Sequence, residues 1–572
     1  MNHTAIDAAS PLPMTRAEMN GIGWSELDIL LVTGDAYVDH PAFGAALLGR
    51  WLADHGYRVG IVAQPRWDSP EDIARMGRPR LFAGVAAGAL DSMLAHYTAF
   101  RKLRRDDAYT PGDRHGARPN RASMVYANLV RHAFPGLPVV IGGIEASLRR
   151  ATHYDFWSDK LRRSILLDSK ADLVVYGMGE RAILEIARRI ESAAGRPLDA
   201  LCGVPGTVFV PPRGYVAPPE TEDLPSHEEI VANPEALMPA TLAIEQQVHH
   251  GGPWLAQESG GRRVYFAPPA APLTQEMLDR LYGLPFTRKP HPAYTERIPA
   301  VEMIQFSVTT HRGCGGGCSF CSLAMHQGRH IASRSAKSIE DEICALTRHS
   351  DWKGSLSDIG GPSANMWASR CTADPRNCGR GSCLTPEICP SFRDGQGELA
   401  RLLQRISAVP GMGHVRVASG VRYDLALQNP AYVRDLASNF VGGQLKLAPE
   451  HCAPSVLDLM RKPRFTVFER FLSVFEEQSQ RAGKRQYIVP YLMSAFPGCT
   501  EDDMRALADW LRSMNWRPKQ VQCFVPTPGS VATAMYVAGK DVAGRPIHVA
   551  RTDAERLRQH RILLGEERGG CA

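Results

Sequence analysis

The stretch HRGCGGGCSFCSLAMHQGR, residues 311–329, gathers three cysteines within eight positions. Their spacing is Cys314-x3-Cys318-x2-Cys321, and only glycines separate the first two. Thiolates are favoured ligands of zinc and of iron–sulfur clusters. Glycine accepts positive φ because it has no Cβ, so this loop can curl its thiols around one centre. The sequence therefore predicts a metal centre here.

The number of thiols in the loop bears on the kind of centre. A structural zinc site usually has four protein ligands arranged as two pairs. His311 and His326 are close in sequence, but neither has the spacing of a zinc finger. Three thiolates instead suit a [4Fe–4S] cluster with one iron left open for a substrate or cofactor. The sequence favours the cluster, and free or zinc-bound cysteines are the alternative.

Apolar runs alternate with helical stretches throughout the second half of the chain. The runs that we expect to be strands are 301–310, 354–361, 414–421, 442–449, 485–493 and 519–526. Six such βα units predict an incomplete (β/α)6 barrel over residues 299–540, with its chemistry at the carboxyl ends of the strands. The three-cysteine loop follows the first of these runs, as that rule requires.

The first half of the chain shows a second alternation. Short apolar runs at 28–35, 57–64, 80–86, 137–146 and 171–180 are separated by helical stretches. This pattern predicts a doubly wound α/β domain over residues 26–200, with a parallel sheet covered on both faces. We expect residues 1–25 to be an irregular lead-in, 201–298 a proline-rich linker and 541–572 a charged C-terminal tail.

Composition excludes several classes of protein. The 572 residues are 44% apolar and 22% charged, which is typical of a globular protein of two to four domains. The net charge of +6 gives no clear signature of nucleic-acid or membrane binding. We see no signal peptide and no apolar run of about 18 residues. We expect a cytoplasmic protein, in which the 13 cysteines serve metal or redox sites rather than disulfides.

A second cysteine set lies in CTADPRNCGRGSCLTPEIC, residues 371–389. Cys371, Cys378, Cys383 and Cys389 follow the second predicted strand of the barrel, at its active end. Four thiols with glycine and proline between them can hold an auxiliary [4Fe–4S] cluster or a structural zinc. The sequence leaves both open, together with free or redox-active thiols.

The motifs at the predicted strand ends resemble the radical SAM superfamily. The three-cysteine spacing, with Phe320 before its last cysteine, is similar to the cluster loop of that family. IGGPSANM, residues 359–366, resembles the glycine-rich turn that binds the amino group of S-adenosylmethionine (SAM). The resemblance implies SAM contacts at Gly360, Gly361 and Pro362, although many members have an acid where this chain has proline. It also implies a contact with ribose or substrate at Glu450, after the fourth strand, where a capping acid is the alternative.

A narrower resemblance covers residues 25–540. LPFTRKPHPAY (284–294), LKLAPEH (445–451) and TAMYVAGK (533–540), with the motifs above, resemble the YgiQ family of radical SAM proteins. The resemblance implies an enzyme that reductively cleaves SAM at a [4Fe–4S] cluster and generates a 5′-deoxyadenosyl radical. The substrate is unassigned, and a methyl- or methylthio-transfer reaction is one option. A flavodoxin- or ferredoxin-type reductant is the implied partner.

Three further questions stay open at this point. A doubly wound domain before the barrel resembles cobalamin-dependent methylases, but the pattern Asp-x-His-x-x-Gly is not met. The nearest stretch, residues 39–44, reads DHPAFG. Arg416, Arg422 and Lys446 are candidates to bind the SAM carboxylate or a substrate acid, and ion-paired scaffolding is the alternative for the arginines. The rival functions are a non-catalytic zinc or nucleic-acid-binding protein and an iron–sulfur redox carrier or sensor.

Overall fold

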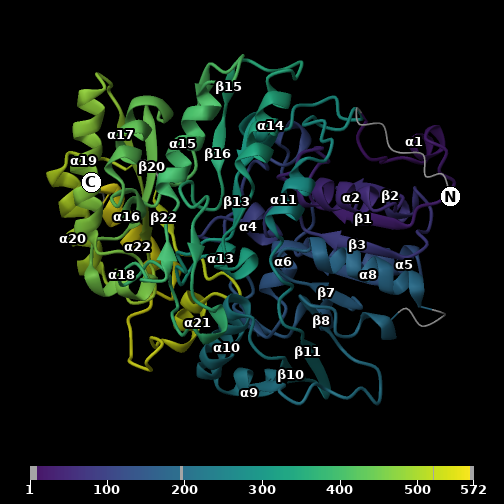
Figure 1. Ribbon diagram of the computed structural model, residues 1–572. Coiled ribbons are helices and arrows are strands. Elements are labelled where there is room, and N and C mark those ends of the chain that lie inside the picture. The colour runs from purple at the N-terminus through teal and green to yellow at the C-terminus, as the bar shows by residue number, and fades with distance from the viewer. Residues whose placement is uncertain (1–9, 194–197, 519–520, 567–572) are drawn as a thin grey trace, which may run out of the picture. The chain divides into compact units, whose positions relative to one another are not determined.

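The chain divides into two compact units, Met1–Gln305 and Phe306–Ala572. The computed structural model in Figure 1 describes residues 10–193, 198–518 and 521–566. The boundary falls seven residues after the predicted start of the barrel, because helix α12 (Pro299–Ile304) belongs to the first unit. The backbone N–H of Ala300, in that helix, donates to the carbonyl of Ala108 at 2.9 Å.

The first unit is built on one sheet whose first five strands are parallel. Their order across the sheet is β2 (Val59–Ala63), β1 (Ile29–Thr33), β3 (Phe82–Ala86), β4 (Val139–Gly142) and β7 (Leu173–Val175). Each lies inside one of the predicted apolar runs. This 2-1-3-4-5 order of a doubly wound sheet has its topological switch point between β1 and β3. The predicted α/β fold class is confirmed.

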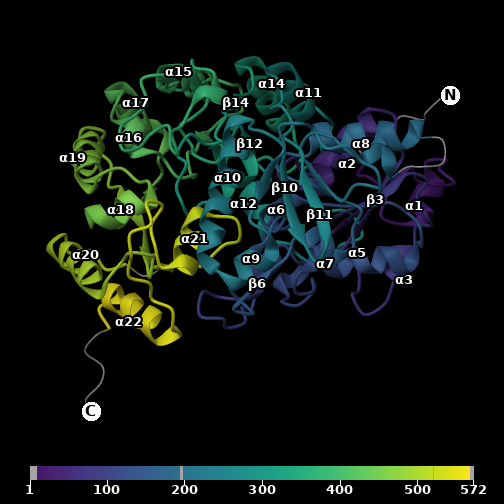
Figure 2. The ribbon, with the colours of Figure 1, turned by 90° about the horizontal axis from the view of Figure 1, so that it is seen from below.

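Helices cover both faces of this parallel sheet. Figure 2 shows α2 (Gly44–Asp54) and α8 (Glu180–Ser192) on one side, and α3 (Glu71–Ala74) and α5 (Ala122–Ala133) on the other. The strands are buried along their length because helices pack on each face, which explains their continuous apolar sequence.

The prediction of a linker over residues 201–298 is wrong, because this segment extends the same sheet. It contributes β8 (Thr207–Phe209), β11 (Arg262–Phe266), β10 (Leu255–Ser259) and β9 (Glu222–Leu224), and it also contains α10 (Leu237–His250). A two-residue turn joins β10 to β11 in antiparallel register. Gly260 and Gly261, with φ of 57° and 69°, form this turn, and Gly-Gly is a favoured sequence for such hairpins. The many prolines of the segment obscured that signal.

The lead-in is also more regular than expected. Helix α1 (Arg16–Gly21) begins at a capping box, in which Thr15 and Glu18 each accept a hydrogen bond from the backbone of the other. Met19 of this helix is fully buried. Residues 1–9 of the predicted lead-in lie outside the described residues.

Each of the six predicted barrel runs holds a parallel strand of the second unit. β12 (Ser307–Thr309) pairs with β16 (Asp358–Gly360), and β15 (Ser355–Leu356) pairs with β19 (His414–Val415). β20 (Gln444–Glu450), β21 (Tyr487–Ser494) and β22 (Gln522–Cys523) form a third parallel group. The strands thus follow chain order, as an incomplete barrel requires. β12 is shorter than its run because α12 takes the first residues.

Amphipathic helices pack around these strands and form the core of the second unit. The longer ones are α14 (Ala336–Leu346), α15 (Gln396–Ser407), α19 (Phe465–Arg481) and α20 (Glu501–Ser513). Their buried residues include Ile343, Leu403 and Phe471, each fully enclosed. Burying side chains of this size stabilises the fold by about 1.5–3 kcal/mol each.

The described part of the predicted C-terminal tail contains a helix, as its sequence indicates, and this helix is packed instead of solvated. Helix α22 (Asp553–Leu564) packs against α20, and Arg556 and Gln559 are fully buried. Arg556 donates to the carbonyl of Phe524, and Gln559 donates to that of Cys499. Polar side chains of this helix therefore bind backbone of the barrel instead of facing solvent. Among the described residues, no helix is both long and apolar enough to cross a membrane.

Candidate metal and cofactor site

The three-cysteine loop lies between two short elements at the end of the first barrel strand. It follows β13 (His311–Arg312) and leads into α13 (Ser322–Gln327). Gly313 has a φ of 83°, and a Cβ there would clash with the carbonyl oxygen of His330. Gly317 has a φ of 59°, and a Cβ there would clash with the carbonyl oxygen of Gly381. The glycines thus allow a tight turn that side chains would block.

The sulfurs of the loop turn toward a common, buried point. A side-chain carbon placed on Gly316 would lie 3.4 Å from Cys314 Sγ and 3.8 Å from Cys318 Sγ. Burial raises the pKa of Cys314, and it raises the pKa of Cys321 to about 12, with the other two thiols adding to the effect. Three thiols that repel one another's negative charge are a donor set suited to a cationic metal centre. The loop therefore fits a three-thiolate cluster by its chemistry.

No preformed single-ion site accompanies this donor set. Within residues 10–193, 198–518 and 521–566, no group of three or more His, Cys, Asp or Glu side chains is arranged to hold one metal ion. This statement covers the three-cysteine loop and the second cysteine set alike.

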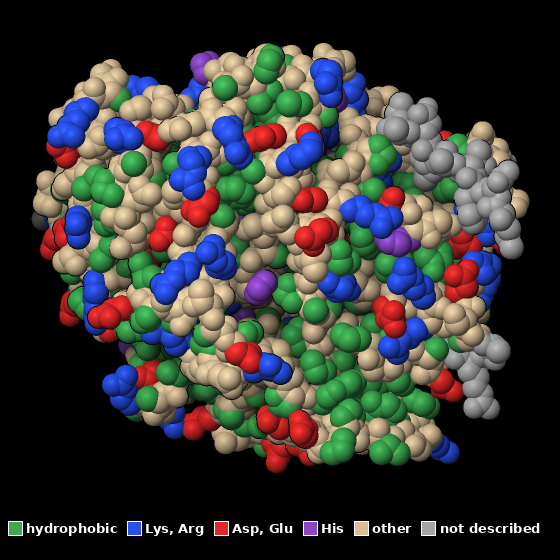
Figure 3. Space-filling view, viewed as in Figure 1, with side chains coloured by type: hydrophobic (Ala, Val, Ile, Leu, Met, Phe, Trp, Pro, Cys, Tyr) green, Lys and Arg blue, Asp and Glu red, His purple; other side chains and the backbone are tan. Residues whose placement is uncertain are grey.

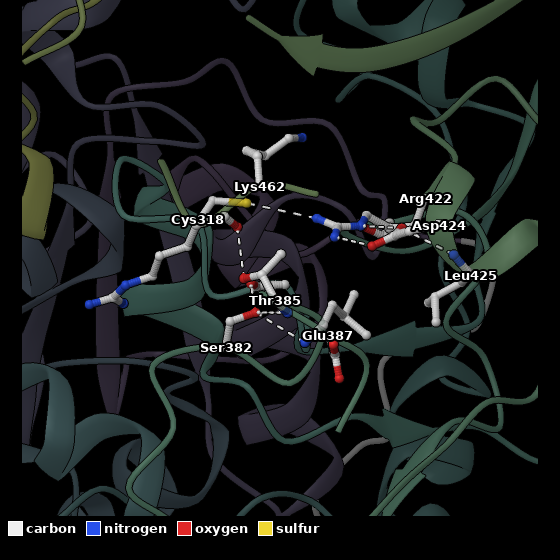
Figure 4. Close-up of polar contacts among 12 residues, drawn as sticks. Cys318, Ser382, Thr385, Glu387, Arg422, Asp424, Leu425 and Lys462 are labelled. Atoms are coloured by element: carbon white, nitrogen blue, oxygen red, sulfur yellow. Dashed lines mark hydrogen bonds and ion pairs between the residues drawn. The ribbon is translucent and has the colours of Figure 1, made fainter. Parts of the chain in front are cut away.

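A buried arginine, Arg422, reaches the loop. Arg422 Nη1 lies 3.8 Å from Cys318 Sγ (Figure 4). Asp424 accepts hydrogen bonds from the other edge of the guanidinium, through Nε at 3.0 Å and through Nη2. Burial alone would lower the pKa of Arg422, but the carboxylate of Asp424 raises it above its ordinary value. A fixed positive charge therefore stands beside one thiol of the three-cysteine loop.

The glycine-rich turn after β16 lies directly against the three-cysteine loop. Ser363 Oγ is 3.6 Å from Cys314 Sγ, and the N–H of Thr310 donates to the carbonyl of Gly360 at 2.7 Å. A Cβ on Gly361 would come within 2.7 Å of the His311 ring. The structure thus brings Gly360, Gly361 and Pro362 to the cysteines, as the predicted SAM site requires.

Glu450 ends β20 in a strained and buried position. Its φ is 67°, which is unusual for a residue other than glycine, and such strain concentrates at functional sites. Its side chain is 8% exposed, with Oε1 4.0 Å from Lys462 Nζ and Oε2 lacking any hydrogen-bond partner in the described chain. Burial raises the pKa of Glu450, while Lys462 and Arg422 lower it. This carboxylate is free to accept a hydrogen bond from a ligand.

Some residues of this site had no sequence signal. Lys462, which is buried beside Glu450, follows an ordinary helix end and carries no motif. Asp424 lies two residues after Arg422, a spacing common on any protein surface, and only its burial sets it apart. Sequence reasoning weighed His311 as a zinc ligand, whereas the structure packs its ring against Gly361.

The second cysteine set folds back onto the three-cysteine loop. β17 (Arg370–Cys371) and β18 (Phe392–Arg393) pair in antiparallel fashion and close the base of the insertion. The N–H of Cys383 donates to the carbonyl of Gly315 at 2.9 Å, and Ser382 Oγ donates to that of Gly316 at 2.6 Å. The two cysteine-rich segments are therefore hydrogen-bonded neighbours.

The thiols of the two sets also share an apolar environment. Cys314, Cys383 and Cys389 pack against one cluster of buried residues, Ile331, Met366, Leu384, Phe392 and Leu425. Burial raises the pKa of Cys383 and the thiols of Cys371, Cys378 and Cys389 raise it further, whereas Arg329 lowers it. Cys371 is exposed, so the outer part of the set faces solvent. The four thiols are thus close enough to influence one another's charge.

The switch point of the first unit is filled by the chain itself. Arg118 is 1% exposed and forms ion pairs with Asp35 and Asp107, each at 2.9 Å. It also donates to the carbonyl of Ala87 at 3.1 Å, just beyond β3. A Cβ on Gly34 would clash with that same carbonyl. The edge where doubly wound sheets bind ligands is therefore packed with a buried ion network.

His40, the histidine nearest to a cobalamin-ligand pattern, is engaged at both ring nitrogens. Its Nδ1 accepts a hydrogen bond from the N–H of Ala42 at 3.0 Å. Its Nε2 lies 3.0 Å from Arg288 Nη1, and the ring is 2% exposed. The described residues around His40 and at the switch point therefore do not fit cobalamin.

Comparison with known proteins places the chain in a family. The radical SAM N-terminal family model matches residues 11–307. A UPF0313 protein of Geobacter sulfurreducens is 53% identical, over 97% of this chain and 92% of that protein. A UPF0313 protein of Thermotoga maritima is 45% identical, over 98% and 99%. One of Methanosarcina acetivorans is 44% identical, over 98% and 79%.

Solved structures with a related arrangement are more distant. Kitasatospora setae TsrM, a radical SAM methyltransferase with cobalamin and a [4Fe–4S] cluster bound, is 16% identical, covering 93% of this chain and 84% of that one, with a TM-score of 0.49. OxsB, a cobalamin-dependent SAM radical enzyme with aqua-cobalamin bound, is 10% identical, covering 95% and 56%, with a TM-score of 0.48.

The family model and the relatives define the class of this chain as a radical SAM protein. Within that class it belongs to the YgiQ family, the UPF0313 proteins, with which it shares nearly its whole length. The family predicted from the motifs is confirmed.

Proposed function

We propose that the chain is a radical SAM enzyme whose cluster is held by Cys314, Cys318 and Cys321. SAM would bind to the open iron of this [4Fe–4S] cluster, against Gly360–Pro362 and Glu450. The observation that carries the proposal is the contact between the buried three-thiol loop and the glycine-rich turn, with Cys314 Sγ 3.6 Å from Ser363 Oγ. Two segments 49 residues apart in sequence are thereby joined into one site.

The bound cluster would supply one electron that breaks the sulfonium C5′–S bond of SAM, giving methionine and a 5′-deoxyadenosyl radical. The chain's own residues would do the rest. Gly361, which has no Cβ, lets the glycine-rich turn pack closely on His311 at the start of the three-cysteine loop. The free oxygen of Glu450 would accept a hydrogen bond from an ammonium or hydroxyl group of SAM.

The test is anaerobic reconstitution with iron and sulfide, followed by dithionite and SAM. We expect about four irons in the three-cysteine site and equal amounts of methionine and 5′-deoxyadenosine. Stoichiometric zinc with no cleavage would favour a structural zinc protein, and iron without cleavage would favour a redox carrier or sensor. On the face drawn in Figure 3, basic and acidic side chains are interspersed, which gives no support to nucleic-acid binding.

The reaction that follows SAM cleavage depends on what the second cysteine set holds. We propose an auxiliary [4Fe–4S] cluster at Cys371, Cys378, Cys383 and Cys389, because these thiols pack on the first loop and influence one another's charge. Such a centre beside the SAM site favours a methyl- or methylthio-transfer reaction. A flavodoxin- or ferredoxin-type protein would supply the electrons.

Replacing these four cysteines by serine should remove about four of about eight irons and leave the three-cysteine cluster in place. The expected readout is iron and sulfide per chain, measured together with zinc. The matched control is Cys344→Ser, a half-buried cysteine of α14 outside both sets, which should change no metal content. Loss of zinc with unchanged iron would show that the second set holds a structural zinc and not a cluster. No change in either metal would show that the second set holds no metal.

Glu450→Gln should weaken SAM binding by about tenfold to a hundredfold, because a hydrogen bond to a charged group contributes about 1.5–3 kcal/mol. The substitution keeps the shape of the side chain and removes only its charge. The measurement is the dissociation constant of SAM from the reconstituted protein. Glu398→Gln, an exposed acid of α15, is the control. If the variant keeps its SAM affinity and its iron content, Glu450 does not contact SAM.

A further inference from the structure

We propose that Arg422 is a positioning residue that sets the reduction potential of the cluster through Cys318, with Asp424 holding it in place. This inference rests on the proposed function, because it requires the cluster at the three-cysteine loop. The side chain of Arg422 is 9% exposed, and its Nη1 lies 3.8 Å from the sulfur (Figure 4). A Cβ placed on Gly316 would lie only 3.2 Å from the same Nη1, so this nitrogen reaches the backbone between Cys314 and Cys318.

Asp424 occupies one whole edge of the Arg422 guanidinium. Nε and Nη2 both donate to the carboxylate of Asp424. Only the Nη1 edge is directed elsewhere, and it points to the sulfur. Arg422 is therefore poorly placed to bind the carboxylate of SAM or of a substrate acid, which was its alternative role.

The backbone around Arg422 is held as firmly as its side chain. The N–H of Arg422 donates to Asn365 Oδ1 at 2.8 Å, and Asn365 Nδ2 donates back to the carbonyl of Arg422 at 3.0 Å. Asn365 is fully buried just past the glycine-rich turn, and its Nδ2 also donates to Gln396 at 3.1 Å. The loop after β19 and the turn after β16 thus fix the guanidinium relative to the thiol, as electrostatic tuning requires.

The direction of the effect follows from charge. Reduction adds one negative charge to a centre that three thiolates already make anionic, and a buried cation stabilises the reduced form more than the oxidised form. Asp424 makes the pair neutral overall, but the cationic end is the one that contacts sulfur. Removing the cation should therefore make the potential more negative, and removing the anion should make it less negative.

The experiment is a redox titration of the full reconstituted chain without SAM, followed by the electron paramagnetic resonance signal of the three-cysteine cluster. That signal is assigned by its absence when the three cysteines are replaced. Arg422→Gln should lower the equilibrium constant for reduction by about tenfold, which is about 59 mV for one electron. Arg422→Lys should stay closer to the parent, and Asp424→Asn should shift the potential in the opposite direction. Arg416→Gln, on the same loop but against Gly442, is the control and should not shift it.

Opposite shifts in Arg422→Gln and Asp424→Asn separate charge tuning from packing. Shifts of both variants in the same direction, or an unmoved potential in Arg422→Gln with normal iron content, would overturn the inference. If Arg422→Gln fails to hold iron, Asp424→Asn decides the outcome by whether its potential becomes less negative. A parent chain that binds no iron at the three cysteines or cleaves no SAM would instead overturn the proposed function.

Discussion

Replacing Cys314, Cys318 and Cys321 together by alanine is expected to abolish reductive SAM cleavage, with a loss of at least about 10³-fold, or about 4 kcal/mol in the activation free energy. Each alanine removes a ligand that nothing else in the loop can replace, since glycines and Ser319 surround them. The reconstituted variant should also lose the iron of this centre and its visible absorbance. The measurements are 5′-deoxyadenosine formed under dithionite and iron per chain.

The control for this triple variant is a pair of cysteines outside both sets. Cys344→Ala and Cys523→Ala remove thiols from α14 and β22 and should leave SAM cleavage intact. Equal cleavage by parent and triple variant would show that the assignment of the cluster loop is wrong. Loss of cleavage with unchanged iron would place the metal elsewhere, with the loop serving only to bind SAM.

The parts of this chain that sequence reasoning predicted are those with strong local signals. Parallel strands buried on both faces appear as short apolar runs, so the five parallel strands of the first unit and the parallel strands of the second unit fall where they were expected. The three-cysteine loop is equally local, because its ligands and its turn-forming glycines lie within nine residues. The affinity of thiols for metals and the backbone freedom of glycine do not depend on distant parts of the chain.

The parts that were missed depend on partners far away in sequence. Residues 201–298 form strands because β8 pairs with β7 and β11 pairs with β8, and both partners lie far apart in sequence. Helix α22 is charged along much of its length, and its burial follows from hydrogen bonds to Phe524 and Cys499. Lys462 becomes significant only through its position beside Glu450. None of these pairings can be recognised from the local sequence of either partner.

The ion network at the switch point of the first unit shows how strongly such distant pairing matters. Arg118→Gln should destabilise that unit by about 3–5 kcal/mol, because it leaves Asp35 and Asp107 buried without their cation. The measurement is denaturant-induced unfolding of the full chain, followed through the transition of the first unit. Arg114→Gln is the matched control, since Arg114 pairs with Glu296 at the surface and such a pair contributes about 0–1 kcal/mol.

The pH dependence of this loss separates charge burial from simple loss of packing. Burial raises the pKa of Asp35 to about 6, although Arg118 acts to lower it. The folded state therefore holds a proton that the unfolded state releases near pH 4, and stability falls as the pH rises through this window. Without Arg118 the pKa should rise further, so the deficit of Arg118→Gln should be larger at pH 8 than at pH 5. An equal deficit at both pH values would mean that Arg118 contributes shape to the switch point and not charge.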